Sequence, residues 1–429
     1  MKKAVVIGSG AGGATAAMEL QGAFDVTVLE AGKEFRRFTV KNQALDKWKK
    51  LGIGLDLGWI PRLFPAMRIA KTEDMVLVYG KGWGGTTTIS AGNALRLDEN
   101  LKAMGINLDA EFEAIERLIP VSTAHREHWG PTARRLYEVC EEMGLEPRVA
   151  PKLGDYSRCR HCGRCILGCP YSVKWDSRDF LSAALKKGAR IVSGATVDRV
   201  LIDSGRAKGV EVRTGWRRRE FVPADLVVLA AGGLGTPPVL ERSGIPGKPR
   251  LFVDPVLTLA AEWPEARLAT EVSMPFIVDK GRYIISPYFD FLSYFFDRRW
   301  RYRSRDILSV MIKLADEPAG EAGAKGVRKA MSAGDNKRLA EAVELTTEIM
   351  VRAGVRKERI LPGILNAGHP GGMFPLAPAE KDTFHSPALT PNVYIADASL
   401  FPDSLGKPPI LTTIALAKRV SRLCRERLA

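Results

Sequence analysis

The first thirty residues place the strongest constraint on the fold. The chain opens with a short apolar segment that runs directly into Gly8, Gly10 and Gly13, continues as an alanine-rich helical pattern, and ends in a second apolar segment that closes on Glu30. Glycines at this spacing allow a tight turn and let a pyrophosphate approach a helix N-terminus, and an acid after the second strand can bind a ribose hydroxyl. The segment therefore predicts a βαβ unit that binds a dinucleotide, with these four residues in contact with it.

A run of cysteines in the middle of the chain is the second feature. From 159 to 170 the sequence reads CRHCGRCILGCP, which contains four of the six cysteines. The spacing Cys-x2-Cys-x2-Cys-x3-Cys-Pro is typical of bacterial ferredoxins, in which thiolates hold a [4Fe-4S] cluster. The run predicts Cys159, Cys162, Cys165 and Cys169 as cluster ligands.

Other interpretations of the run stay open. A structural zinc site uses similar thiolates, although it usually takes two Cys-x2-Cys pairs separated by a longer loop. A disulfide cluster is disfavoured because the spacings are short and nothing else indicates export. In two-cluster ferredoxins the last cysteine serves the other cluster, so a remote residue could replace Cys169. Cys140 and Cys424 are the remaining thiols, but both lie in apolar helical patterns where a lone cysteine is usually a buried hydrophobe.

The composition is strongly basic, with 64 Lys and Arg against 49 Asp and Glu and a formal net charge of +15. A basic surface favours an acidic partner or an anionic membrane face. Because ferredoxins are commonly acidic, we expect ferredoxin or another acidic electron-transfer protein as the partner, with peripheral membrane contact as the alternative. The sequence contains no nucleic-acid-binding motif, so we expect no nucleic-acid partner.

The apolar stretches are all interrupted before the roughly 20 residues that a membrane-spanning helix needs. The thiols are arranged as ligands rather than dispersed in pairs, which is typical of a reducing compartment. We therefore expect a cytoplasmic protein that touches a membrane only at its surface.

The apolar pattern along the rest of the chain alternates between strands and helices. It predicts strands within 189–214, 225–235 and 392–396, and helices at 306–315, 337–353 and 410–427. No repeat or low-complexity linker separates these elements, so we expect two interleaved lobes. His125 and His128 stand three apart on a polar stretch and are expected at the surface.

Four blocks of sequence complete the pattern. They are the N-terminal glycine segment, GWGGTTTISAGN at 82–93, AAGGLGTPPVLERSGI at 230–245, and HPGG at 369–372 followed by NVYIADASLFPDSLGKPPILTTIALA at 392–417. Together they resemble the glucose-methanol-choline (GMC) flavoprotein oxidoreductases, and the last block is especially similar to the cholesterol-oxidase-like branch. The complete ferredoxin spacing of the cysteines departs from the common oxidases of that family.

The resemblance implies an α/β fold in which a Rossmann-like FAD-binding domain is interleaved with a smaller sheet-based substrate domain. On this basis we expect the FAD-binding domain to comprise residues 1–95, 185–250 and 365–429. We expect the cysteine cluster in a segment of its own, 96–184, and the substrate or cap domain in 251–364.

The resemblance also implies which residues contact FAD. In addition to Gly8, Gly10, Gly13 and Glu30, these are Gly84, Gly85, Thr86, Val197, Asp397, Ala398 and Thr412. Thr412 falls near the start of the last predicted helix, whose positive N-terminal end would point at the flavin.

Two residues are candidates for catalysis. His369 matches the active-site histidine of the family, which accepts the hydroxyl proton while hydride passes from the substrate carbon to flavin N5. The family's second catalytic residue, an asparagine or histidine, aligns here with Pro408, which offers no side-chain hydrogen bond. Lys407 either supplies the missing group as a cation or is a solvated loop lysine.

A flavin and a cubane cluster in one chain predict conversion between two-electron and one-electron transfer. The leading hypothesis is an FAD- and [4Fe-4S]-dependent oxidoreductase that acts on an alcohol or carbonyl substrate and exchanges electrons with ferredoxin or a partner protein rather than dioxygen. The alternatives are an electron-transfer subunit of a larger redox complex, a C=C reductase, and a flavoprotein with a structural metal site. Aromatic residues at 288–302 and 59–67 are compatible with a lipid-like substrate or a membrane contact, although aromatics also line ordinary flavin substrate lobes.

Overall fold

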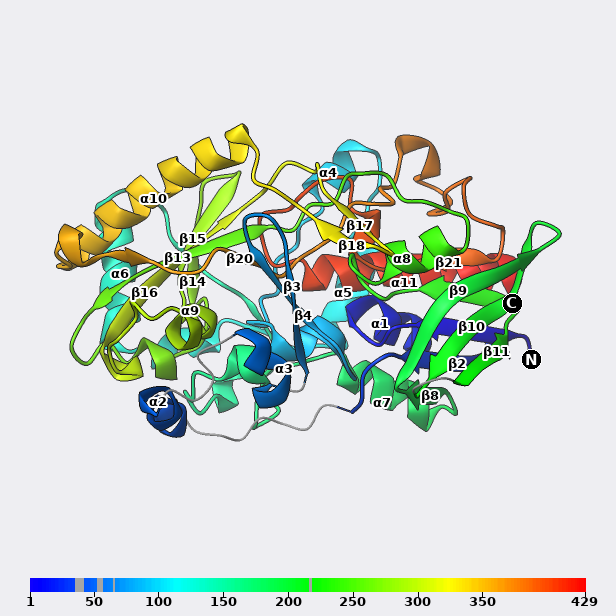
Figure 1. Ribbon diagram of the computed structural model, residues 1–429, viewed down its shortest axis with the longest axis horizontal. Coiled ribbons are helices and arrows are strands. Elements are labelled where there is room, and N and C mark those ends of the chain that lie inside the picture. Colours follow the sequence, from blue (N-terminus) through cyan, green and yellow to red (C-terminus); the bar gives the residue numbers. More distant parts are fainter. Residues whose placement is uncertain (35–41, 52–56, 65, 216–217) are drawn as a thin grey trace.

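The computed structural model describes residues 1–34, 42–51, 57–64, 66–215 and 218–429. Pro65, within the aromatic stretch at 59–67, lies outside the described residues. The molecule is elongated, and both chain ends lie at the same end of it (Figure 1).

A parallel sheet with strand order β21-β12-β1-β2-β8 forms that end of the molecule (Figure 1). Its strands are β1 (Lys3–Ile7), β2 (Asp25–Glu30), β8 (Arg190–Ser193), β12 (Leu226–Leu229) and β21 (Val393–Ile395). The central strands are apolar runs because a parallel sheet is covered on both faces. Since β1 lies between β2 and β12, the glycine turn that follows it opens at the carboxyl edge of the sheet, where ligands bind in this class of fold.

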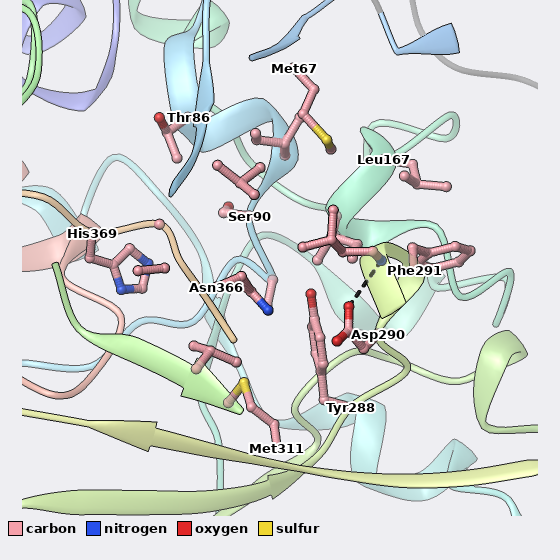
Figure 2. A pocket seen from close by; sticks show the side chains of 18 of the residues that line it. Met67, Thr86, Ser90, Leu167, Tyr288, Asp290, Phe291, Met311, Asn366 and His369 are labelled. Carbon is pink, nitrogen blue, oxygen red and sulfur yellow. Dashed lines mark hydrogen bonds between the residues drawn. The ribbon is translucent and has the colours of Figure 1, made fainter. Parts of the chain in front are cut away.

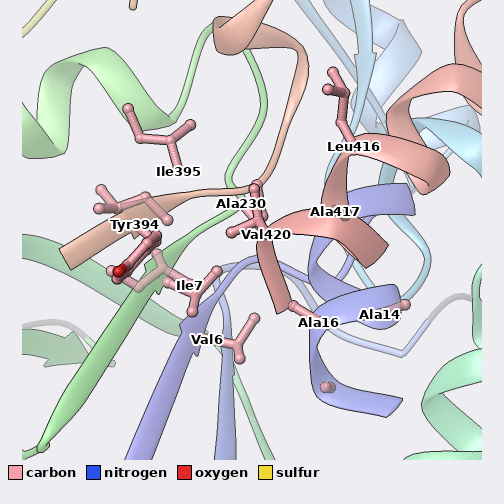
Figure 3. Close-up of a cluster of buried hydrophobic side chains, with 14 of the residues drawn as sticks. Val6, Ile7, Ala14, Ala16, Ala230, Tyr394, Ile395, Leu416, Ala417 and Val420 are labelled. Carbon is pink, nitrogen blue, oxygen red and sulfur yellow. The ribbon is translucent and has the colours of Figure 1, made fainter. Parts of the chain in front are cut away.

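Two helices from opposite ends of the sequence pack together on this sheet. They are α1 (Ala11–Leu20) and α11 (Ile410–Leu428), and their small side chains share one buried core with β1 and β21 (Figure 3). A Cβ at Gly12 would lie 1.7 Å from the carbonyl oxygen of Ala396, and a Cβ at Gly13 would lie 2.1 Å from that of Gly8. Glycine is therefore required at 12 and 13 by the close approach of backbone segments.

A second, mainly antiparallel sheet forms the other end, with strand order β3-β4-β20-β13-β16-β15-β14-β6 and β19 paired with β13. Its strands are β3 (Met67–Lys71), β4 (Val76–Gly80), β6 (Arg148–Val149), β13 (Pro255–Glu262), β14 (Phe276–Asp279), β15 (Tyr283–Pro287), β16 (Ile307–Leu314), β19 (Leu361–Pro362) and β20 (Asn366–Ala367). Helices α6 (Pro131–Glu142) and α10 (Ala333–Ala353) pack on each other and share a buried core with this sheet (Figure 1).

The prediction of a helix at 306–315 is wrong, because this segment forms β16. The strand pairs with β13 on one side and β15 on the other, and every one of its residues is buried. A strand covered on both faces shows no alternation of apolar and polar residues. Its run of apolar residues therefore also fits the spacing expected of a buried helix.

The remaining elements complete the two ends. The strands are β5 (Val121–Ser122), β7 (Lys152–Leu153), β9 (Ala195–Asp203), β10 (Arg206–Thr214), β11 (Arg218–Pro223), β17 (Glu321–Gly323) and β18 (Gly326–Arg328). The helices are α2 (Asn42–Lys50), α3 (Ile60–Leu63), α4 (Glu99–Ala103), α5 (Asp109–Glu116), α7 (Arg178–Lys186), α8 (Thr236–Arg242) and α9 (Phe291–Phe296), with 3-10 helices η2 (Gly85–Ile89) and η5 (Cys165–Leu167) among the shorter segments.

The other predicted elements are confirmed. Strands β8, β9 and β10 occupy 189–214, β12 and β21 lie where strands were expected, and α10 and α11 match the two long helices. The fold is mixed α/β with a Rossmann-like parallel sheet, as expected. Among the described residues, no helix combines the length and apolar composition that crossing a membrane requires.

Candidate active site

A cavity of about 1100 Å³, counted with the space open to solvent, lies against strands β3, β4, β13, β16 and β20 of the second sheet, with His369 in its wall (Figure 2). Most of its lining is apolar and comes from α3, η5, α9 and β16, including Ile60, Phe64, Leu167, Phe291, Phe295 and Met311. The polar groups in the wall include Thr86, Ser90, Tyr288, Asn366 and Lys313. An apolar chamber with a few polar groups is the usual form of a small-molecule site.

His369 belongs to a buried group of charged side chains. Its Nδ1 lies 3.4 Å from the carboxylate Oδ2 of Asp254, and the Nζ of Lys313 lies 3.2 Å from the same oxygen. Asp254 and Lys313 are almost fully buried, whereas about one-fifth of the His369 side chain is exposed toward the open cavity. Neither His369 Nδ1 nor Asp254 Oδ2 has a hydrogen-bond partner among the described residues, so their 3.4 Å contact is an ion-pair distance and not a hydrogen bond. An imidazole proton on Nδ1 would face the carboxylate and leave the Nε2 lone pair free.

Burial and neighbouring charges shift the pKa values of His369 and Asp254. The pKa of His369 is lowered from 6.5 to about 4, by burial and by the positive charge of Lys313, against the opposing effect of Asp254. Burial opposes ionisation of Asp254, but Lys313 and His369 outweigh it and lower the pKa of that carboxyl. His369 is therefore neutral at neutral pH and available as a proton acceptor.

The backbone at Asp254 is held in a strained conformation by a second buried pair. Asp254 has a φ of 53°, in the left-handed region that non-glycine residues rarely adopt. Its Oδ1 accepts from Ser404 Oγ at 2.6 Å, and its backbone N–H donates to Asp316 at 2.9 Å. Asp316 is in turn paired with the buried Lys329, whose Nζ lies 2.8 Å away. These contacts fix the carboxylate that faces His369.

The structure does not bring Lys407 into the cavity. Its Nζ forms an ion pair with Asp279 Oδ2 at 2.7 Å, and the neighbouring Pro408 and Ile410 form the cavity wall instead. The positive charge in the wall comes from Lys313 on β16, which the sequence interpretation missed.

Aromatic residues of the stretch at 288–302 line the cavity beside β16 (Figure 2). Asp290 caps α9, since its carboxylate accepts from the N–H groups of Leu292 and Ser293 at 2.9 and 3.2 Å. Burial raises the pKa of Asp290. The acid therefore orients the helix that presents Phe291 and Phe295 to the cavity.

The predicted nucleotide-binding residues meet at the carboxyl edge of the parallel sheet. Glu30 accepts from Ser9 Oγ at 2.6 Å and from the N–H groups of Ser9, Gly32 and Gly82 at 3.1, 2.7 and 3.1 Å. The carboxylate thus joins the first glycine turn to the segment at 82–93, and its contact with a ribose stays a prediction. A Cβ at Gly10 would meet no atom within 4 Å, so this glycine leaves room beside the start of α1.

The glycine segment at 82–93 lies directly against this turn. A Cβ at Gly85 would lie 3.0 Å from Cα of Gly10, and Gly84 has a φ of 90° that permits the chain to turn into η2. Thr86 Oγ1 accepts from the N–H of Gly80 at 3.0 Å and Thr86 lines the cavity. The structure therefore brings Gly84, Gly85 and Thr86 together with the N-terminal glycines, between the nucleotide edge and the cavity.

The four other expected cofactor contacts have hydrogen-bond or packing partners within the chain. Asp397 accepts from Gly232 N and Thr236 Oγ1, and Thr412 Oγ1 accepts from Leu97 N at 2.9 Å. Val197 is buried in the core shared with the parallel sheet. Ala398 follows Asp397 and packs against the same core. Their contacts with a cofactor stay predictions.

The four cysteines of the run line a separate cavity of about 350 Å³. His161, Gly163 and Gly168 have φ values of 44°, 64° and 91°, which curl the segment. A Cβ at Gly163 would lie 1.8 Å from the carbonyl oxygen of Ala269, so glycine is required there. The curl makes Cys159, Cys162, Cys165 and Cys169 face one space.

Two buried polar groups in this cavity, the hydroxyl of Tyr156 and the carboxylate of Glu271, have no hydrogen-bond partner in the described part of the chain. The hydroxyl of Tyr156, which is 1 % exposed, makes no hydrogen bond there, and the residue lines the cavity with the cysteines. An orphaned buried hydroxyl favours an acceptor that the protein atoms do not supply. Within the described residues, no three or more His, Cys, Asp or Glu side chains converge so as to bind a single metal ion.

The two cavities share a wall. Ile166 and Leu167, which stand between the third and fourth cysteines of the run, line the cavity at His369, whereas Cys165 and Cys169 line the cysteine cavity. Helix η5 also packs against η2 of the glycine segment. One short loop therefore contacts both spaces.

The surface position expected for His125 is wrong. Its ring is fully buried, with Nε2 2.9 Å from the carbonyl oxygen of Ala150 and Nδ1 accepting from Trp129 Nε1 at 3.0 Å. His128 is exposed, as expected. Cys140 and Cys424 are buried in α6 and α11, which confirms them as core residues.

Comparison with known sequences defines the family. The GMC oxidoreductase family model matches residues 3–258, which is more than half of the 429 residues. The chain belongs to the GMC oxidoreductase family. Membership shows an oxidoreductase and supports FAD as its cofactor.

Three relatives of this GMC oxidoreductase illustrate the range of similarity. An uncharacterised GMC-type oxidoreductase of Mycobacterium tuberculosis is 34 % identical over 266 residues, which are 58 % of this chain and 40 % of that protein. A long-chain-alcohol oxidase of Arabidopsis thaliana is 27 % identical over 292 residues, 61 % of this chain and 37 % of the oxidase. This chain thus spans about 40 % of the length of these two relatives. An uncharacterised protein of Methanocaldococcus jannaschii is 24 % identical over 97 % of this chain and 98 % of its own.

Among solved structures, pyridoxine 4-oxidase from Mesorbium loti has the same fold. The TM-score is 0.73, the match covers 98 % of this chain and 99 % of the oxidase, and the sequence identity is 16 %. Because two relatives are named as oxidases, the expected exclusion of dioxygen as acceptor stays a prediction.

The sequence interpretation missed Asp254 and Lys313. Asp254 directly precedes β13, and Lys313 is a single charge within the apolar run of β16. A lysine inside an otherwise apolar buried strand was the available signal, because lysine is almost never fully buried unless it is paired.

Proposed function

We propose that this GMC oxidoreductase is an FAD- and [4Fe-4S]-dependent dehydrogenase that oxidises the hydroxyl group of an apolar alcohol, or reduces the corresponding carbonyl, and exchanges single electrons through the cluster with an acidic carrier such as ferredoxin. The observation that carries the proposal is the shared wall, in which Ile166 and Leu167 line the chamber at His369 while Cys165 and Cys169 line the adjacent cavity. Electrons from the chamber would have a short route to the cluster, and dioxygen is not the acceptor.

The residues present fit FAD. The space beside Gly10 and the adjacent start of η2 suit a pyrophosphate at the N-terminus of α1, and the N-terminal residues of α11 lie at the chamber wall. Gly84, Gly85 and Thr86 would hold the flavin end. FAD supplies the acceptor for the two electrons that leave the substrate carbon as hydride.

His369 would accept the hydroxyl proton. Its Nδ1 lies 3.4 Å from Oδ2 of Asp254, and with the proton on Nδ1 the Nε2 nitrogen would take a proton from a hydroxyl in the chamber. Lys313 places a buried positive charge in the same wall, where it would stabilise the developing alkoxide. Lys313 would thus take the electrostatic role that was one of the two alternatives for Lys407.

The cysteine cavity fits a cluster better than a single ion. Each iron of a cubane takes one thiolate, so four cysteines that line one space suit it, whereas a zinc ion needs four ligands converging on one point. The unpartnered hydroxyl of Tyr156 would donate to a cluster sulfur. The backbone N–H of Ser273 is already directed to Cys165.

The chamber favours an enzyme over an electron-transfer subunit. A subunit that only relays electrons has no use for an apolar chamber of about 1100 Å³ with a proton acceptor in its wall. The apolar lining favours alcohols with a hydrocarbon body over sugars or charged substrates.

Anaerobic purification and spectroscopy test the proposal. We expect FAD, close to four iron and four sulfide per chain, and a paramagnetic signal of the reduced cluster on titration with dithionite. Medium- and long-chain alcohols should bleach the visible absorbance of FAD without oxygen. Zinc in the cysteine site, or turnover that needs no cluster because dioxygen reoxidises the reduced FAD, would contradict the proposal.

Matched variants separate the two centres. Cys162→Ser should remove the cluster signal and electron transfer to ferredoxin but keep FAD, whereas Cys140→Ala, in the core of α6, should keep both. His369→Gln should keep both cofactors and slow bleaching by about 10²–10⁴-fold, the usual contribution of a general base.

A further inference from the structure

Two lysines between the cavities are buried without a carboxylate partner. Lys152 and Lys174 are 0 % and 3 % exposed. In the part of the chain that the structure describes, neither Nζ lies within 4.0 Å of a carboxylate oxygen. Burying a charge is costly unless it is paired, so a buried ammonium needs a source of negative charge nearby.

The atoms around each ammonium are neutral oxygens. The Nζ of Lys152 donates to the side-chain oxygen of Asn93 and to the carbonyl oxygens of Ser273 and Met274, the last two at 2.7 and 2.9 Å. The Nζ of Lys174 donates to the carbonyl oxygen of Thr87 at 2.6 Å. Carbonyl oxygens orient an ammonium but do not neutralise it.

Both lysines lie beside the cysteine cavity. Lys174 lines it, and the charge of Lys152 interacts with Cys165 and Cys159. Ser273, whose carbonyl accepts from Lys152, directs its own N–H to Cys165. A Cβ at Gly92 would lie 2.8 Å from Cγ of Lys174, so glycine there makes room for the side chain.

On their other side, the same ammonium groups hold the glycine segment expected at the flavin. Thr87 belongs to η2, and Asn93 ends the segment at 82–93. The two side chains therefore bridge the loop beside the expected FAD site and the loop that carries the cysteines.

Two carboxylates lie near this cavity. Asp176 is paired with Arg178 at 2.7 Å, and its negative charge also raises the pKa of Lys174. The carboxylate of Glu271, which lines the cavity, has no hydrogen-bond partner among the described residues, and burial raises its pKa to about 7. Burial lowers the pKa of both lysines. Four cysteine thiolates would supply the negative charge that Lys152 lacks and would add to that of Asp176 at Lys174.

We propose that Lys152 and Lys174 are the internal countercharges of the iron-sulfur cluster, and that they raise its reduction potential so that the cluster accepts an electron from the chamber side. This inference rests on the proposed function. One-electron reduction takes a [4Fe-4S] core from 2+ to 1+, so the core with its four thiolates goes from 2− to 3−. A fixed positive charge stabilises the reduced form more than the oxidised form.

A redox titration of the purified protein, followed by the paramagnetic signal of the cluster, tests the inference. In Lys152→Met and Lys174→Met, the ratio of reduced to oxidised cluster at a fixed ambient potential should fall at least tenfold, which is about 59 mV for a one-electron couple. Lys174→Arg keeps the charge and should keep the wild-type midpoint. Lys186→Met removes the same charge from the exposed face of α7 and should also leave the midpoint unchanged.

The outcomes distinguish a failure of the proposed function from a failure of the countercharge role. Absence of a cluster signal in the wild-type protein overturns the proposed function before any variant is made. A wild-type cluster whose midpoint stays the same in both methionine variants overturns only the countercharge role and leaves the lysines as loop anchors. If Lys152→Met does not fold, as judged by circular dichroism and FAD content, Lys174→Met and Lys174→Arg decide the question.

Discussion

Nδ1 of His369 lies 3.4 Å from Oδ2 of Asp254, an oxygen that also receives the ammonium of Lys313 at 3.2 Å. One carboxylate oxygen thus lies beside both the expected proton acceptor and a cation in the same wall. Burial and the charge of Lys313 lower the pKa of the imidazole, and the charge of Asp254 opposes them.

The pH dependence of alcohol oxidation should report this arrangement. The pKa of His369 is lowered to about 4, so the neutral acceptor is present above pH 4 and is lost only as the pH falls through that value. We expect the acidic limb of kcat/KM near pH 4 rather than near 6.5. A limb near 6.5 in the wild-type protein would contradict the buried arrangement.

Substitution of Lys313 should shift the acidic limb of the profile of kcat/KM against pH. The positive charge of Lys313 lowers the pKa of His369, whereas Asp254 raises it, so Lys313→Met should shift the acidic limb toward higher pH. Lys313→Arg keeps the charge and serves as the control. Profiles of kcat/KM against pH for the three proteins measure the shift, and identical profiles would exclude an electrostatic role for Lys313.

The apolar chamber predicts a dependence on substrate length. Each buried methylene contributes about 0.8 kcal/mol, so kcat/KM for primary alcohols should rise about fourfold per added carbon until the chamber is filled. Steady-state rates with ferredoxin as acceptor across a homologous series measure this slope. A flat series would mean that the hydrocarbon chain does not enter the chamber.

Two neighbouring glycines should respond differently to alanine. In Gly12→Ala the new Cβ meets the carbonyl of Ala396 at 1.7 Å, so the contact between α1 and the end of β21 must open and the melting temperature should fall. In Gly10→Ala the Cβ meets no protein atom within 4 Å, so stability should persist while FAD binding weakens. Thermal unfolding and FAD titration separate the effects, and equal losses of stability would contradict the packing argument.

The second buried ion pair should be a major contribution to stability. Lys329→Met leaves Asp316 buried without its cation and should lower the free energy of unfolding by roughly 3–5 kcal/mol. The adjacent Arg328 forms only an exposed pair with Glu321, so Arg328→Ala should produce no measurable change. Urea denaturation compares the two variants, and similar midpoints would show that the buried pair is dispensable.

The sequence predicted the parallel sheet well because its strands and turns have local signals. The glycine turn after β1, the strand at 225–235 and the final helix each follow from short patterns. The helix expected at 306–315 was wrong because β16 is buried on both faces and loses the period of a strand. Lys313 lies on that strand, so the mistaken helix also concealed the cation beside His369.

Contacts between distant segments account for the rest of what the sequence could not predict. The position of Asp254 against His369 depends on Ser404 and on the Asp316–Lys329 pair, which no local pattern encodes. His125 lies in a polar stretch but is buried because Trp129 and Ala150 supply its hydrogen bonds. The two alternatives for Lys407, a catalytic cation or a solvated loop lysine, did not include the ion pair with Asp279, because that pair is a long-range contact.

The loop between Cys165 and Cys169 gives its two apolar side chains, Ile166 and Leu167, to the chamber wall. The shape of the chamber therefore depends on how that loop is held. Under the proposed function, a substitution that moves this loop would therefore alter the cysteine site and the chamber at the same time.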